Sequence, residues 1–190
     1  EDLEIPWDIA FLPNGSMLVT ERTGHVVEVG ADGTKREIPI PGVRQGGEGG
    51  LLGLVLHPDF QVNNYLYLYM SAPGTAGETL NRVVRYTFAN DILTEDKVII
   101  ENIPGAVYHD GGRMEFGPDS KLYVTTGDAT TANIAQDTRS LGGKILRLND
   151  DGSVPSDNPF GTRVYSYGHR NPQGLAWDSA GRPWETEHGR

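Results

Sequence analysis

Residues 113–125 read RMEFGPDSKLYVT, which is a short apolar strand, a turn and a second apolar strand. The proline of the turn restricts its own φ angle, and the Asp-Ser pair after it bends the chain back, so the stretch predicts a β-hairpin. The same pattern recurs at 9–20, 54–69 and 175–186. One apolar anchor of each copy marks the spacing, which is 45, 60 and 61 residues between Phe11, Leu56, Phe116 and Trp177.

Spacings of this size are typical of β-propellers, in which each blade is a four-stranded sheet. Further strands are expected after the first three hairpins, at 24–29, 82–88 and 144–149. We therefore predict an all-β chain in which residues 1–190 form a single partial propeller domain, about three blades and the start of a fourth. A β-sandwich is the alternative, but it does not explain one motif recurring four times.

Closed propellers typically have about 4–8 blades, so three blades and a part do not complete a ring. The sequence thus predicts either part of a larger propeller or a homo-oligomer that completes the ring by self-association. The chain begins with Glu1 and Asp2 rather than with an apolar signal peptide, so a processed chain is expected.

Composition excludes several classes of function. The net charge is −10 and no basic cluster occurs, which argues against a nucleic-acid partner. Cysteine is absent, so disulfides, cysteine-bound zinc and thiol nucleophiles are excluded. No apolar stretch approaches the ~20 residues of a membrane span.

Polar segments flanked by glycine lie next to the recurring hairpins, at 47–50, 109–113, 168–174 and 187–190. Because they occupy equivalent places in successive blades, we expect them to converge on the propeller axis. A site at this end of the axis is the strongest functional inference from the pattern.

Four residues in these segments have side chains suited to chemistry. His109 is a candidate general base, or else a turn histidine bonded to the backbone. Glu48, among glycines, is a candidate contact for a polar ligand, or else a solvated turn residue. The adjacent pair Arg170 and Asn171 suits an anionic, oxygen-rich ligand, or else a salt bridge between blades.

The same segments resemble the soluble PQQ-dependent glucose dehydrogenases and aldose sugar dehydrogenases (glucose/sorbosone dehydrogenases). The resemblance extends in order along nearly the whole chain and is most specific at GHRNPQGLA and EHG. The matching stretches are GEGGLLGL at 47–54, HPDF at 57–60, HDGGR at 109–113, LGGKILRL at 141–148, GHRNPQGLA at 168–176 and EHG at 187–189.

This resemblance implies a six-bladed propeller that carries pyrroloquinoline quinone (PQQ) and calcium. It implies oxidation of the C1 hydroxyl of an aldose sugar to the lactone, with electrons passing through PQQ to an acceptor. It also implies a periplasmic or secreted location.

The resemblance further assigns roles to residues of the polar segments. His109 matches the general base, Glu48 lies where the glucose enzymes contact the sugar, and Tyr108 replaces an aspartate that assists the base. PQQ contacts are implied for Arg170, Asn171 and His188, and calcium ligation for the backbone carbonyls of Gly189 and Arg190.

Two other functions are compatible with the architecture. The first is a non-catalytic half-propeller module that self-associates through its open sheet edges. The second is a calcium-dependent propeller lactonase, which would need no quinone. The sequence offers no carboxylate-rich metal cage for the second.

Overall fold

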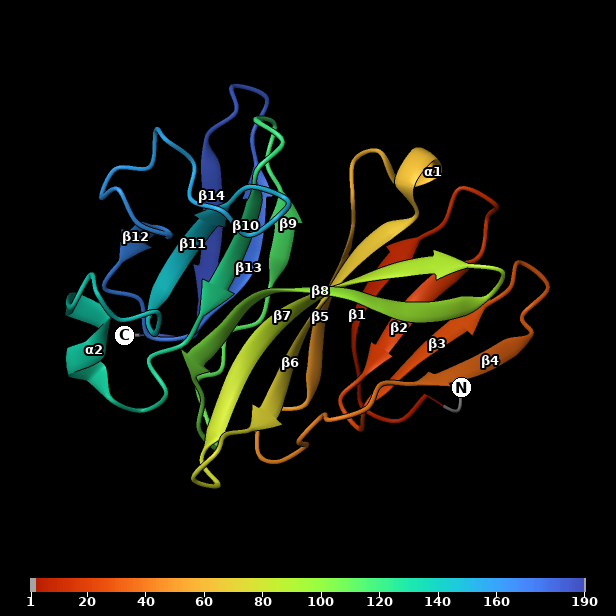
Figure 1. Ribbon diagram of the computed structural model, residues 1–190, viewed down its shortest axis with the longest axis horizontal. Helices are drawn as coiled ribbons and strands as arrows, with labels where there is room; N and C mark the ends of the chain where they lie inside the picture. The colour runs from red at the N-terminus through yellow and green to blue at the C-terminus, as the bar shows by residue number, and fades with distance from the viewer. Residues whose placement is uncertain (1–2, 190) are drawn as a thin grey trace.

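The structure is a computed structural model that describes residues 3–189, and it consists mainly of antiparallel strands (Figure 1). Three four-stranded sheets follow one another along the chain, and in each of them neighbouring strands are consecutive in sequence. A two-stranded sheet comes last. This order is the one predicted from the recurring hairpins, namely three blades and the start of a fourth.

The first blade comprises β1 (Pro6–Phe11), β2 (Met17–Glu21), β3 (His25–Val29) and β4 (Lys35–Pro39). The second comprises β5 (Leu51–Leu56), β6 (Tyr65–Pro73), β7 (Thr79–Ala89) and β8 (Ile92–Pro104). The third comprises β9 (Met114–Phe116), β10 (Leu122–Thr126), β11 (Lys144–Leu148) and β12 (Val164–Tyr167). The fourth begins with β13 (Pro172–Trp177) and β14 (Pro183–Glu187). Two short helices, α1 (Phe60–Asn63) and α2 (Ala132–Gln136), lie in connections between strands.

The hairpin that opened the sequence analysis shows why these residues fold as they do. Gly117 N donates to Lys121 O at 2.9 Å, and Ser120 N donates to Gly117 O at 2.9 Å, which closes the turn between β9 and β10. Tyr123 then pairs with Glu115 across the hairpin. The turn residues and the apolar strands therefore form the hairpin that the pattern predicted.

The second blade is buried on both faces. Along β6, Leu66, Leu68 and Met70 belong to the apolar cluster shared with the first blade. The alternate residues Tyr67 and Tyr69 belong to the cluster shared with the third blade. Because successive side chains of a strand point to opposite faces, one strand contributes to two cores and fixes the blades on either side of it.

Two tyrosines of β6 are packing residues. Tyr67 and Tyr69 are both fully buried. Each hydroxyl donates to a backbone carbonyl of the third blade, Tyr67 to Asp150 O at 3.0 Å and Tyr69 to Asp110 O at 2.8 Å. A buried tyrosine hydroxyl is tolerated when it has a hydrogen-bond partner, and both hydroxyls have one here.

Phe11 differs from the other anchors of the repeat. It is 70% exposed, and its neighbour on the same face of β1, Ile9, is 47% exposed. Ala10, on the opposite face of β1, and Leu12, just after the strand, pack on the second blade. Within the described residues, no helix is both long enough and apolar enough to span a membrane.

Leu68→Ala should strongly destabilise the fold, because Leu68 is fully buried in the cluster between the first two blades. We expect the free energy of unfolding to fall by about 2–5 kcal/mol in urea titrations. Val62→Ala in the same blade is the matched control: Val62 is 85% exposed, and its loss should change stability by less than about 0.5 kcal/mol. Equal effects of the two substitutions would contradict this packing.

Candidate functional site

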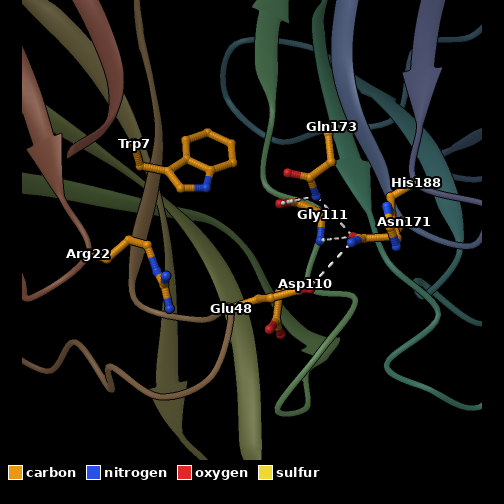
Figure 2. Close-up of a pocket in the computed structure, with 8 residues that line it drawn as sticks. All are labelled: Trp7, Arg22, Glu48, Asp110, Gly111, Asn171, Gln173 and His188. Carbon is orange, nitrogen blue, oxygen red and sulfur yellow. Dashed lines mark hydrogen bonds between the residues drawn. The ribbon is translucent and has the colours of Figure 1, made fainter. Parts of the chain in front are cut away.

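The polar segments do converge at one end of the blades (Figure 2). Trp7 and Arg22 of the first blade lie across from Gln173 and His188 of the fourth, and Glu48 of the second blade lies between them. Together they line a cavity of about 290 Å³, with Asp110, Gly111 and Asn171 completing the wall. The convergence expected from equivalent blade positions is therefore observed, although the His109 imidazole is not part of this lining.

Glu48 connects three blades through one carboxylate oxygen. Its Oε2 accepts the backbone N–H of His109 at 2.8 Å and the side-chain N–H of Asn171 at 3.2 Å. The other oxygen, Oε1, makes no hydrogen bond with residues 3–189. One oxygen of Glu48 thus joins the loops before β9 and β13, and the other remains available to a ligand.

The loop that carries Glu48 is held from both sides. Glu48 N donates to Val107 O at 2.8 Å. A Cβ on Gly47 would lie 2.0 Å from the same carbonyl oxygen, and its φ is +57°, so glycine is required there. From the first blade, Arg22 Nη2 donates to the carbonyl oxygens of Gly47 and Gly49.

His109 is oriented by a carboxylate on the neighbouring hairpin. Its Nδ1 lies 2.7 Å from Oδ1 of Asp128, a residue that is 5% exposed. The same oxygen accepts the backbone N–H of Thr130 at 2.9 Å. Because an ionised carboxylate can only accept, His109 Nδ1 carries a hydrogen, and in the neutral form of the ring the lone pair is on Nε2. His109 Nε2 has no hydrogen-bond partner within the described chain.

The Asp128 contact was not predicted from the sequence. Tyr108, the residue directly before His109, is 56% exposed. Asp128 follows β10 and lies 19 residues beyond His109. The signal available in the sequence was its position two residues after the second strand of a blade, close to where His188 lies one residue after β14 in the fourth.

Asn171 is used mainly to hold the loops together. It is 3% exposed. Its Oδ1 accepts Gly111 N at 3.0 Å and Gln173 Nε2 at 3.0 Å, in addition to the bond that its Nδ2 donates to Glu48. One amide N–H of Asn171 is left over.

Arg170 and His188 lie side by side. Arg170 Nη1 donates to His188 O at 2.9 Å, and His188 N donates to Asn171 O at 3.0 Å. The backbone N–H of Arg170 is bound by Glu187 Oε1 at 2.8 Å. The rest of the Arg170 guanidinium makes no hydrogen bond within residues 3–189. Gly189 follows His188 directly, and Arg190, the other predicted calcium ligand, lies outside the described residues.

Asp110 is a buried acid that the sequence analysis did not single out. It is 1% exposed. Its Oδ1 accepts Asn81 Nδ2 at 2.9 Å and Ala106 N at 3.2 Å, whereas Oδ2 has no partner. Burial raises the pKa of Asp110 above its ordinary value, and the charge of Glu48 raises it further.

Comparison with known proteins places these residues in a family. Residues 3–190 match the profile described as "Glucose / Sorbosone dehydrogenase". The chain belongs to the glucose/sorbosone dehydrogenase family. It is 36% identical to the aldose sugar dehydrogenase YliI of Escherichia coli, over 100% of this chain and 55% of that protein. It is 32% identical to quinoprotein glucose dehydrogenase B of Acinetobacter calcoaceticus, over 99% of this chain and 47% of that protein.

Solved structures of relatives agree with the family assignment. The PQQ-bound aldose sugar dehydrogenase of Streptomyces coelicolor superposes with a TM-score of 0.93 at 42% identity, covering 100% of this chain and 58% of that one. The chain therefore spans about half the length of the curated relatives it matches.

Asp110→Asn should stabilise the protein at neutral pH, because it removes a buried charge. The folded pKa of Asp110 is raised, so the folded state keeps this proton to higher pH than the unfolded chain, and ionisation at neutral pH is unfavourable to folding. We expect a gain on the order of 1 kcal/mol in urea titrations at pH 7. The gain should vanish at pH values below the usual pKa range of aspartate, where Asp110 is protonated in both the folded and the unfolded state.

Asp151→Asn is the matched control for this measurement. Asp151 is exposed, and hydrogen bonds from Ser153 lower its pKa, so its replacement should leave stability unchanged or slightly lower at pH 7. A loss of stability in Asp110→Asn at pH 7 would show that the Asp110 carboxylate is not destabilising.

Proposed function

We propose that the full-length protein oxidises the C1 hydroxyl of an aldose sugar to the lactone, with PQQ as redox cofactor and His109 as general base. The observation that carries the proposal is the His109–Asp128 pair, which leaves Nε2 without a hydrogen-bond partner in the described chain, on a residue whose backbone N–H is bound by Glu48. The names of relatives support it, since they include a quinoprotein glucose dehydrogenase and a PQQ-bound aldose sugar dehydrogenase.

His109 performs the proton step in this proposal. Asp128 holds the Nδ1 hydrogen, so Nε2 accepts the proton of the sugar hydroxyl as the C–H bond is oxidised. The imidazolium that results is stabilised by the Asp128 carboxylate at 2.7 Å. Glu48 Oε1 provides an acceptor for a further sugar hydroxyl, which would orient the ring.

The residues beside this base suit the implied cofactor. Arg170 keeps most of its N–H groups unused, and its planar fork matches a carboxylate. The remaining N–H of Asn171 and the adjacent His188 would complete the contacts. When bound, PQQ supplies the electron sink that the amino acids lack. Calcium would be held by the backbone carbonyls of Gly189 and Arg190, because calcium accepts carbonyl oxygen as a ligand.

The rest of the proposal follows from the family resemblance. The electrons would pass from the cofactor to an external acceptor, and the protein would act in the periplasm or outside the cell. A lactonase would cleave lactones without any quinone, so a lactone substrate tested without PQQ separates the two activities.

His109→Gln should lower kcat for aldose oxidation by about 10²–10⁴-fold, because a positioned general base contributes that much. Asp128→Asn should also lower kcat. Without the carboxylate the hydrogen is no longer held on Nδ1, so the imidazole can adopt the tautomer in which Nε2 carries it and cannot accept a proton. The measurement is dye reduction by the full-length protein loaded with PQQ and calcium. His25→Gln is the control: His25 lies on β3 and contacts Thr23, and its loss should leave kcat within about twofold. Failure of the loaded wild-type protein to reduce the dye with any aldose would contradict the proposed function.

A further inference from the structure

Lys144 is a fully buried cation without a carboxylate partner among residues 3–189. It begins β11, and its amine donates to three backbone carbonyls. The oxygens belong to Ile134 at 2.8 Å, Ala135 at 3.0 Å and Gly142 at 2.6 Å. An ammonium has three donors, so every one of them is used.

Keeping this charge buried is unfavourable. Taking an ammonium out of water costs several kcal/mol even after relaxation. Burial accordingly lowers the pKa of Lys144 to about 8, although the charge of Asp137 acts in the opposite direction. A methionine would fill similar space without this cost, but it would take a donor from all three carbonyls. Ile134 O and Ala135 O would keep the backbone N–H groups of Asp137 and Gly168, whereas Gly142 O has no other donor within residues 3–189. The amine therefore has a function that an apolar side chain cannot replace.

The three carbonyls lie in the segment between β10 and β11, residues 127–143, which we call the α2 segment. It begins at Gly127 and Asp128, and it is closed at its base by Gly143 N donating to Gly127 O at 2.7 Å. Lys144 binds carbonyls in the middle of the segment and near its end. One side chain thus fixes the segment on which Asp128 is mounted.

The α2 segment also holds the loop that carries Arg170. Asp128 N donates to Arg170 O at 2.8 Å, Gly168 N to Ala135 O at 2.9 Å and His169 N to Gly143 O at 3.2 Å. Two of these bonds involve residues close to Lys144: its amine binds Ala135 O, and Gly143 directly precedes it in sequence. Movement of the segment would therefore displace both Asp128 and Arg170.

We propose that Lys144 is a positioning residue, whose amine fixes the α2 segment so that Asp128 is set against His109 and Arg170 is held beside the same site. Its effect on catalysis rests on the proposed function, whereas its effect on the segment does not. A side chain that merely adds stability would loosen the whole molecule, while a positioning residue would loosen these two loops selectively.

The test compares Lys144→Met with wild type in the full-length protein, using hydrogen exchange read by mass spectrometry. We expect amide exchange to become at least tenfold faster in peptides covering 127–143 and 165–172, while peptides from β2 and β3 keep the wild-type rate. Lys97→Met is the matched control, because the Lys97 amine donates to one surface carbonyl, Asp151 O at 2.8 Å. No change, or a uniform rise over all peptides, would overturn the proposal.

Chemical rescue tests whether the amine itself is required, and it also decides the case if Lys144→Met does not fold. The 190 residues contain no cysteine, so Lys144→Cys introduces a single thiol into this region. Alkylation of the unfolded variant with 2-bromoethylamine rebuilds an amine of lysine length, and alkylation with 1-bromopropane builds a neutral chain of similar size. After refolding, only the amine should restore slow exchange in both peptides. Equal protection by the neutral chain would refute the role of the amine.

Dye reduction by the PQQ- and calcium-loaded protein then measures the catalytic consequence. We expect Lys144→Met to lower kcat at least tenfold, with recovery in the amine-rescued protein and none in the propyl form. Selective loosening without any loss of kcat would overturn the catalytic part of the proposal. Inactive wild-type protein would instead refute the proposed function and leave the exchange result to be judged alone.

Discussion

The hydrogen bond between His109 Nδ1 and Asp128 Oδ1 is the interaction on which the site depends. An imidazole has two nitrogens, and this 2.7 Å contact decides which of them is the base. The chain accepts an unfavourable backbone to make it, since His109 has a φ of +65°. Gly127 allows the approach, because a Cβ there would lie 1.8 Å from His109 O. Two loops of the third blade therefore pass in direct contact.

The apolar cores and the polar network have different tasks. The two clusters on either face of the second blade fix the blades relative to one another. Glu48 then links the loops that emerge from the next two blades, through His109 and Asn171. Hydrogen bonds of this kind are short-range and directional, so they hold their geometry only because the packed sheets beneath them do not shift.

Local features of the sequence predicted the fold. Each hairpin combines a turn residue with two apolar strands, so the strands β9 and β10 followed from neighbours in sequence. The convergence of Glu48, Asn171 and His188 followed from their equivalent places in successive blades. Pairings across the fold were not predictable in this way. The contact of Asp128 with His109 joins separate loops, and the carbonyls around Lys144 are gathered by the path of the α2 segment. Neither these contacts nor the unpartnered Oδ2 of Asp110 is encoded by a spacing in the sequence.

The protonation of His109 tests the account most directly. Long-range proton–nitrogen correlation in the full-length protein at pH 8 reports which imidazole nitrogen carries hydrogen, and the His109 signal is assigned by its loss in His109→Gln. We predict the tautomer with hydrogen on Nδ1 and a bare Nε2. Hydrogen on Nε2, or a mixture of both tautomers in exchange, would contradict the orientation of the base by Asp128.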